Sequence, residues 1–260
     1  MPEFIDTHCH LAHRRLLRQV PAVLERAAQA GVSTVICASG ELEEAQQCRK
    51  LAADYHTVYF TAGVHPHVAK DAPDGYVETL RSLLKDPKCL AVGECGLDYY
   101  YDLSPRPVQR RVFAEQLQLA RQERRRVVIH TREAFADTLA VLRESGIDGS
   151  MVVFHSFAQQ QSEDLAAALD IGAAIGFSGI VTFAKSHTLR SAATAVPDDR
   201  ILIETDSPYL SPEPVRRSKT NEPANVRHVA ECLAAPRGVT LDALARLTTA
   251  NARRIFGLAD

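Results

Sequence analysis

The protein has 260 residues, of which 46% are hydrophobic and 24% charged, and its formal net charge is −2 at pH 7. This composition predicts a globular protein with a full hydrophobic core, in one domain that spans residues 1–260. The charge balance excludes a strongly basic surface that tracks a long polyphosphate, so we expect any contact with nucleic acid to be local.

The sequence lacks the signals of a membrane or secreted protein. No window approaches about 18 consecutive apolar residues, and Glu3 and Asp6 stand where a signal peptide would be basic and then apolar. The six cysteines show no C-x-x-C spacing. We therefore expect a cytoplasmic, monomeric protein with reduced thiols and no membrane partner.

Short β-rich runs alternate with amphipathic runs along the chain. Eight strands are predicted at 3–8, 33–39, 58–64, 90–96, 126–131, 151–156, 172–178 and 201–207. Helical periodicity is clear at 107–124, at 222–234, and at 241–255 after a capping Thr240. Eight β-α repeats predict a (β/α)8 TIM-type barrel, an α/β fold. A doubly wound sheet is the alternative, but no Gly-rich phosphate loop follows the first strand.

Side chains that bind metals recur where the predicted strands end. In chain order these residues are His8, His10, His65, Glu94, His130, His155 and Asp206. A single histidine at a strand end is more often an ordinary core residue than a ligand. The carboxyl ends of barrel strands meet at one rim, however, and several polar groups buried there need partners to offset their desolvation. The pattern therefore predicts a metal centre.

The types of donor atom limit which metal ions suit the predicted site. His8 and His10 project to one face of an extended strand, and Cys9 projects to the other. Imidazole with carboxylate suits Zn²⁺, Mn²⁺, Ni²⁺ or Fe²⁺, whereas an all-oxygen set would suit Mg²⁺ or Ca²⁺. Four histidines and two carboxylates exceed one tetrahedral site. We therefore expect two divalent ions, with Glu94 as the bridging carboxylate.

An ordered set of motifs runs from Phe4 to Leu258. It comprises "DTHCHL", "GVHPH", "GECGLDYY", "VVIHTREA", "FHSF", "ETDSPYL" and "NEPANVRHVAECL…LTTANARRIFG". Together these motifs resemble the TatD family of metal-dependent deoxyribonucleases, within the amidohydrolase superfamily. The resemblance implies a TIM-type barrel that hydrolyses phosphodiester bonds in DNA with Mg²⁺ or Mn²⁺. It also implies 3′-5′ exonuclease action on single-stranded or frayed ends.

The resemblance assigns roles to matched residues. One ion would be held by His8, His10 and Glu94, and the second by Glu94, His130 and His155. Asp206 would be a further ligand or the general base, and His65 would lie near the scissile phosphate. Two loops depart from the family pattern: no glycine follows His155 before Gly172, and 215–219 reads "VRRSK". Both departures concern substrate preference.

The expected reaction is attack of a metal-bound hydroxide on phosphorus, in line with the departing 3′ oxygen. Asp206 would orient the water and accept its proton, and Glu94 would hold both ions. Asp6 and Glu204 each lie two residues before a site residue. We favour a hydrogen-bonding role for both, orienting metal-bound histidines, over direct ligation.

Substrate contacts are predicted from cationic and aromatic residues in the loops. The candidates for phosphate binding are His65, Arg132, Arg216, Arg217 and Lys219. The tyrosines at 99–101 could stack an unpaired base or pack as a lid, and we favour the lid for at least two of them.

Two other functions fit the same residues. The first is a metal-dependent hydrolase of an amide, lactone or phosphotriester on the same barrel. Related barrels often bridge their metals with a modified lysine, so Glu94 favours the nuclease. The second is a metal-dependent binding protein without turnover, against which Asp206 argues.

Overall fold

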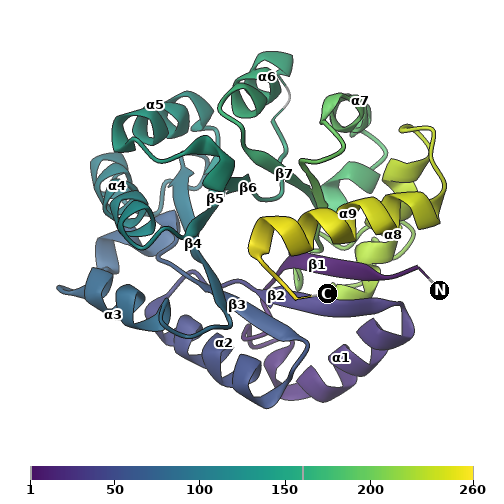
Figure 1. The fold of residues 1–260 in the computed structure, drawn as a ribbon, viewed down its shortest axis with the longest axis horizontal. Coiled ribbons are helices and arrows are strands. Elements are labelled where there is room, and N and C mark those ends of the chain that lie inside the picture. The colour runs from purple at the N-terminus through teal and green to yellow at the C-terminus, as the bar shows by residue number, and fades with distance from the viewer. Residues whose placement is uncertain (1, 160, 260) are drawn as a thin grey trace. The chain divides into compact units, whose positions relative to one another are not determined.

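The computed structural model describes residues 2–159 and 161–259, in which β-strands alternate with α-helices (Figure 1). The strands are β1 (Phe4–Cys9), β2 (Val32–Cys37), β3 (Val58–Ala62), β4 (Cys89–Asp98), β5 (Arg126–Arg132), β6 (Val152–Phe154), β7 (Ala174–Phe177) and β8 (Ile201–Ile203). They lie in one sheet in chain order from β1 to β8, and β8 also contacts β1. This is the strand order of a (β/α)8 barrel, so the predicted fold class is confirmed.

Helices follow nearly every strand. They are α1 (Val20–Gln29), α2 (Leu42–Asp54), α3 (Tyr76–Leu83), α4 (Arg106–Gln122), α5 (Phe135–Ser145), α6 (Ser162–Asp170), α7 (His187–Ala195), α8 (Val226–Ala234) and α9 (Leu241–Phe256). Short 3₁₀ helices are η1 (Leu17–Gln19), η2 (Pro66–Asp71), η3 (Gly149–Met151), η4 (Gly179–Thr182) and η5 (Pro223–Asn225). Within the described residues, no helix combines the length and hydrophobicity needed to cross a bilayer.

The three helices predicted from periodicity are confirmed. The 107–124 pattern corresponds to α4, the 222–234 pattern to η5 and α8, and the 241–255 pattern to α9. The Thr240 side chain caps α9 by accepting a hydrogen bond from the Ala243 amide at 3.2 Å. Sequence spacing alone therefore located these helices well.

Some strand ends differ from the prediction. β6 and β8 end earlier than predicted, because the chain turns before the polar residues that follow them. Ser156 and Asp206 there have φ angles of 44° and 55°, in the left-handed region that a strand does not use. β4, in contrast, continues past the predicted 90–96 to Asp98. That extension places Asp98 on a strand face.

The chain folds into two compact units. The first unit comprises the described parts of 1–37, 155–162 and 175–260, and the second comprises 38–154 and 163–174. Because each unit draws on separate stretches, no point in the sequence divides them into successive domains.

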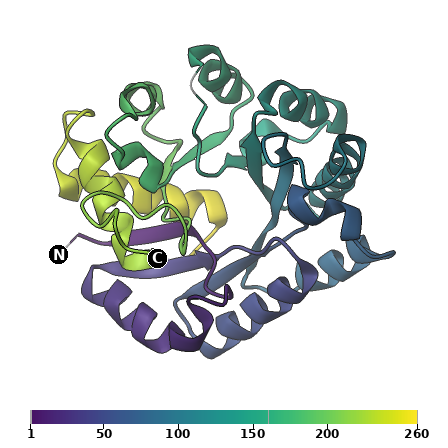
Figure 2. The same ribbon diagram turned by 180° about the vertical axis from the view of Figure 1, so that it is seen from behind.

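The first unit contains the pairings of β1 with β2 and of β7 with β8. Helix α9 packs along β1 and β8, as the yellow helix beside the purple strand shows in Figure 1. Its inner face buries Leu244, Ala252 and Phe256. Figure 2, from behind, shows the segment after β8 beside β1. The Asp206 amide donates to the His8 carbonyl at 2.9 Å, which fixes this segment against the end of β1.

The second unit contains the pairings from β3 to β6. All ten residues of β4 are buried, and α4 packs on this strand. The amphipathic periodicity predicted over 107–124 is confirmed, since Phe113, Leu117 and Ala120 are buried on α4. Two glycines allow the end of β3 to approach β4 closely. A Cβ on Gly63 would lie 2.7 Å from the Gly93 Cα, next to Glu94.

We predict that Gly63→Ala destabilises the protein by about 2–3 kcal/mol, since the added methyl would force apart two backbones that cannot yield cheaply. Gly75→Ala is the matched control, because nothing lies within 4 Å of its added Cβ, and the only cost is the positive φ of 77°, about 1 kcal/mol. Urea unfolding of both variants measures the difference. Equal losses would contradict the close approach of β3 and β4.

Candidate metal-binding site

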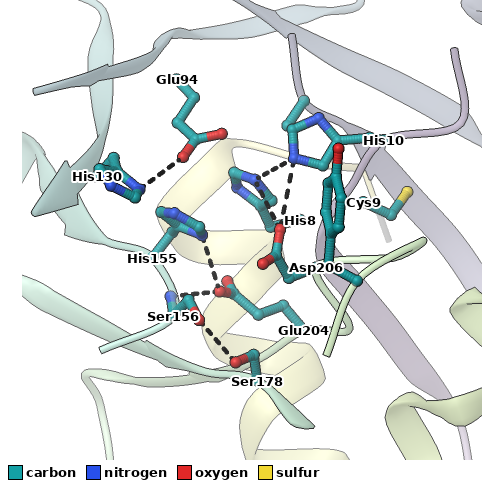
Figure 3. Close-up of polar contacts among 12 residues, drawn as sticks. His8, Cys9, His10, Glu94, His130, His155, Ser156, Ser178, Glu204 and Asp206 are labelled. Atoms are coloured by element: carbon teal, nitrogen blue, oxygen red, sulfur yellow. Dashed lines mark hydrogen bonds and ion pairs between the residues drawn. The ribbon is translucent and has the colours of Figure 1, made fainter. Parts of the chain in front are cut away.

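Polar side chains of the first unit gather at the ends of β1, β6 and β8. We call this group the first cluster: it consists of His8, His10, His155, Glu204 and Asp206 (Figure 3). Strand alternation places His8 and Cys9 on opposite faces of β1. The Cys9 thiol donates to the Ile36 carbonyl at 3.6 Å, so it points away from the cluster as predicted.

Three donor atoms of the first cluster converge. The His8 and His10 Nε2 atoms are 3.3 Å apart, and Asp206 Oδ1 lies 3.4 Å from His10 Nε2 and 3.8 Å from His8 Nε2. His8 is 1% exposed, whereas His10 and Asp206 are 13% and 14% exposed, so the group faces outward from a buried base. Two imidazole nitrogens and a carboxylate oxygen are donors that suit a divalent transition metal.

Asp206 is held in its ionised form. Burial alone would raise the pKa of this carboxyl, but the hydrogen bond from His10 and the nearby His155 and His8 rings lower it below its usual value. Its backbone is left-handed, with φ of 55°, which aspartate tolerates better than most residues. The residue is therefore an anion at neutral pH, on the segment that follows β8.

Glu204 contacts the His155 ring. Glu204 Oε1 lies 3.3 Å from His155 Nδ1 and accepts the Ser156 amide hydrogen. Its Oε2 accepts from the Thr7 hydroxyl at 3.3 Å. A Cβ at position 176 would lie 2.6 Å from this oxygen, so Gly176 leaves the room that the carboxylate fills.

Both oxygens of Glu204 are thus engaged by the protein. This contact agrees with the predicted orienting role for Glu204. His8, His155 and Glu204 also offer three atoms within 4.8 Å of one another, so direct ligation is the alternative. The hydrogen bonds favour orientation, because a carboxylate that satisfies backbone and hydroxyl donors has less capacity for a cation. The His8 and His155 rings stack at 4.0 Å between centroids.

The structure corrects the role predicted for Asp6. Its carboxylate accepts hydrogen bonds from the Thr205 amide at 2.9 Å, the Thr205 hydroxyl at 2.6 Å and the His8 amide at 3.3 Å. These contacts hold backbone rather than an imidazole ring. Complete burial raises the pKa of Asp6 to about 8, against the lowering effect of the Thr205 bonds. Asp6 therefore fixes β1 to the segment after β8.

The second cluster lies in the second unit and consists of His65, His67, Glu94, Asp98 and His130. Glu94 Oε1 is 3.4 Å from His65 Nε2 and 3.2 Å from His130 Nδ1, and the latter contact is drawn in Figure 3. These three residues offer atoms within 4.8 Å of one another and could hold an ion. Glu94 is 5% exposed, so its charge needs such neighbours.

The tautomer of His65 follows from its contacts. Burial lowers the pKa of His65 to about 4, although Glu94 acts to raise it, so the ring is neutral at pH 7. Its Nδ1 accepts the His67 amide hydrogen at 3.2 Å. The ring proton is therefore on Nε2, which makes His65 a hydrogen-bond donor at that atom. This proton faces Glu94 Oε1 at 3.4 Å, and the contact of His65 with phosphate stays a prediction.

Asp98 is a residue that the sequence interpretation missed. Its Oδ2 lies 3.0 Å from His130 Nε2 and 2.9 Å from His67 Nε2, and its Oδ1 accepts the Tyr100 and Tyr101 amide hydrogens. Burial would raise the pKa of Asp98, but these bonds hold it well below the usual range. Asp98 is thus the anionic acceptor that orients His130.

A usable signal for Asp98 was present. Asp98 lies four residues after Glu94, so both side chains share one face of an extended strand. The predicted strand ended at residue 96 and left Asp98 outside it. Because β4 extends to Asp98, the alternation of side chains along the strand places Asp98 on the same face as Glu94.

The predicted phosphate-binding cations lie at the end of β5 and in the segment that follows β8. Arg132, Arg216, Arg217 and Lys219 are exposed. The Arg216 guanidinium lies 3.6 Å from the centre of the Phe183 ring, and the Lys219 carbonyl accepts from Arg15 at 3.5 Å. These are the contacts of Arg216 and Lys219 with neighbouring residues. A role in substrate binding stays a prediction for all four cations.

The three tyrosines at 99–101 differ in packing, and the lid stays a prediction. Tyr99 packs, with its hydroxyl donating to Asp137 at 2.7 Å and the Arg106 guanidinium over its ring. Tyr100 and Tyr101 remain about half exposed. Asp98 accepts hydrogen bonds from their backbone amides, and the Tyr101 ring lies edge to face with the His67 ring, at 5.3 Å between centroids.

A barrel whose strand ends carry clustered histidines and carboxylates defines a class of metal-binding α/β barrel. Within that class, residues 5–257 match the sequence profile of the family described as TatD related DNase. The match covers nearly the whole chain. The protein therefore belongs to the TatD-related DNase family, and the resemblance drawn from its motifs is confirmed.

Relatives and solved structures agree with this assignment. The chain is 42% identical over 255 residues to the uncharacterized metal-dependent hydrolase YcfH of Escherichia coli K12, covering 97% of this chain and 95% of that one. It is 37% identical over 262 residues to the 3′-5′ ssDNA/RNA exonuclease TatD of Edwardsiella piscicida, covering 98% and 100%. The crystal structure of YjjV, a TatD homolog from E. coli K12, superposes with a TM-score of 0.92 at 28% identity, covering 98% of each chain.

We predict that Asp98→Asn lowers the free energy of unfolding by about 2–3 kcal/mol, because the amide cannot accept from two imidazoles and two backbone amides at once. Urea unfolding at pH 7 measures the loss. The matched control is Asp102→Asn, an exposed carboxylate in the same loop that pairs with Arg106, for which we expect less than about 0.5 kcal/mol. Equal stabilities of the Asp98 variant and the native protein would contradict the role of Asp98.

Proposed function

We propose that this protein is a divalent-metal-dependent deoxyribonuclease that hydrolyses phosphodiester bonds as a 3′-5′ exonuclease on single-stranded or frayed ends. The observation that carries the proposal is the convergence of His8 Nε2, His10 Nε2 and Asp206 Oδ1 in a chain of the TatD-related family. Relatives named as 3′-5′ ssDNA/RNA exonucleases support the direction of cleavage and the unpaired substrate. A cytoplasmic location and a monomeric state stay predictions.

The proposed cofactor is a pair of divalent ions, Mg²⁺, Mn²⁺ or Zn²⁺. The proposed ligands are His8, His10, Glu94, His130, His155 and Asp206. Both clusters suit divalent ions, because each presents imidazole nitrogen and carboxylate oxygen atoms close together among buried residues. Glu94, the carboxylate of the second cluster, is the proposed bridging ligand.

The residues have separate tasks in this mechanism. When bound, the ions would activate water and neutralise charge on the phosphate and the leaving oxygen. Asp206, ionised and partly accessible, orients the attacking water and accepts its proton. His65 carries its proton on Nε2 and donates it in a hydrogen bond to a phosphate oxygen. Glu204 and Asp98 hold His155 and His130 in place.

Arg132, Arg216 and Lys219 are proposed to contact phosphates of the substrate, together with His65. Guanidinium groups match phosphate oxygens in a bidentate manner. Few such contacts are available on a chain with a net charge of −2. The affinity for DNA should therefore fall only modestly with added salt.

The test of the proposed function compares two substrates. A 3′-labelled single-stranded oligonucleotide and a small lactone are incubated with the protein and Mn²⁺ or Mg²⁺. We expect release of 3′ nucleotides one at a time and no turnover of the lactone. Turnover of the lactone alone would assign the protein to another hydrolase class on the same barrel. Tight binding of DNA without cleavage would assign a binding function.

We predict that the double variant His8→Ala/His10→Ala loses one of two bound ions per chain, because it removes two of the proposed ligands of a single ion. Elemental analysis of protein purified without chelator measures the metal content. His228→Ala is the control, since His228 pairs with Glu231 on α8 and is not among the proposed ligands, and its metal content should be unchanged. A double variant with the full metal content would exclude these histidines as ligands.

We predict that Asp206→Asn keeps most of the bound metal and loses about 10²–10⁴-fold in kcat, because the amide cannot accept a proton from water. Cleavage rates at saturating oligonucleotide, measured beside the metal content, test this prediction. A near-normal kcat would show that another group accepts the proton.

A further inference from the structure

Two neighbouring aromatic side chains of the second unit are unusually exposed. Tyr100 and Tyr101 are 53% and 52% exposed, and Leu103 beside them is 52% exposed. Single exposed apolar residues are common, whereas neighbouring exposed apolar side chains form a candidate binding surface. The loop directly follows β4.

This pair is anchored to the second cluster. Asp98 Oδ1 accepts the Tyr100 and Tyr101 amide hydrogens at 3.0 and 2.8 Å, while Oδ2 of the same carboxylate contacts His130. The Tyr101 ring also meets His67 edge to face, at 5.3 Å between centroids. The backbone of the two tyrosines is therefore held by Asp98, two and three positions earlier in the chain, and the same carboxylate orients a proposed metal ligand.

The Arg132 guanidinium lies against both tyrosine rings. The Arg132 guanidinium lies 3.9 Å from the centre of the Tyr100 ring and 4.8 Å from that of Tyr101. The two rings are 4.9 Å apart and nearly perpendicular, at 84°. Arg132 is the last residue of β5, two positions after His130. Two aromatic rings and a guanidinium group therefore lie together on this surface.

We propose that Tyr100 and Tyr101 form a stacking subsite for an unpaired nucleobase, with Arg132 pairing the phosphate of the same nucleotide. The inference rests on the proposed nuclease function and adds how the single strand is held. A flat aromatic face stacks on any base, and a guanidinium matches the adjoining phosphate. A base in a duplex already stacks on its neighbours, so this subsite favours single strands without selecting their sequence.

The test uses two 3′-labelled oligothymidylates that differ only in their bases. The second carries abasic tetrahydrofuran nucleotides at its 3′ end, so it keeps the phosphodiesters and lacks the rings. The native protein should cleave the base-bearing strand with a kcat/KM about 10- to 100-fold above that of the abasic strand. The double variant Tyr100→Ala/Tyr101→Ala should lose this preference by slowing only on the base-bearing strand.

Two further variants separate stacking from damage to the loop. Tyr100→Phe/Tyr101→Phe keeps the aromatic faces and should keep the preference for bases. Leu103→Ala removes exposed apolar area from the same loop without a ring and should leave the preference within about twofold, because it offers no stacking face.

The outcomes distinguish this inference from the proposed function. Equal cleavage of both strands by the native protein, or equal slowing on both strands in the alanine double variant, would overturn the subsite while the nuclease function stands. Failure to cleave either strand would contradict the nuclease function instead. In that case, the two strands are compared by fluorescence anisotropy in EDTA. Tenfold tighter binding of the base-bearing strand supports the subsite, and equal binding refutes it.

Discussion

The burial of imidazoles and carboxylates at strand ends is the constraint on which the rest of the structure depends. His8, His155 and Glu204 are nearly inaccessible in the first unit, as are Glu94 and Asp98 in the second. Removing such groups from water is costly unless each finds a partner. Much of the local structure around both clusters supplies these partners, and the polar atoms that remain directed outward are those suited to a cation.

The supporting layer differs between the clusters but follows one principle. In the first cluster, Glu204 fills the space left by Gly176 and faces His155, while Asp6 fixes the backbone that carries His8. In the second, Asp98 alone accepts from two imidazoles and two amides. Such acceptors hold ligands in place before a metal arrives, which lowers the reorganisation needed for binding and catalysis.

Periodicity predicted much of the fold. The order of eight strands and the buried faces of α4, α8 and α9 follow from where apolar residues recur, because burial acts directly on that pattern. The placement of histidines and carboxylates at strand ends predicted that these side chains gather where the strands end. His8, His10 and Asp206 meet as expected, and so do Glu94 and His130.

What the sequence failed to predict depends on backbone detail. Asp98 was overlooked because the predicted strand ended at residue 96, two positions before the end of β4, so the alternation that begins at Glu94 was not followed to Asp98. Asp6 was expected to contact an imidazole, yet hydrogen bonds to Thr205 draw it to the backbone. The exposure of Tyr100 and Tyr101 depends on a turn that Asp98 holds, which no hydrophobic pattern records.

Anomalous diffraction from crystals of the Mn²⁺-loaded protein would test the central claim most directly. The account predicts two peaks per chain, about 3.5–4 Å apart, on His8, His10, His130, His155 and Asp206, with Glu94 touching both. A single peak, peaks on other side chains, or a Glu94 carboxylate that binds neither ion would contradict it.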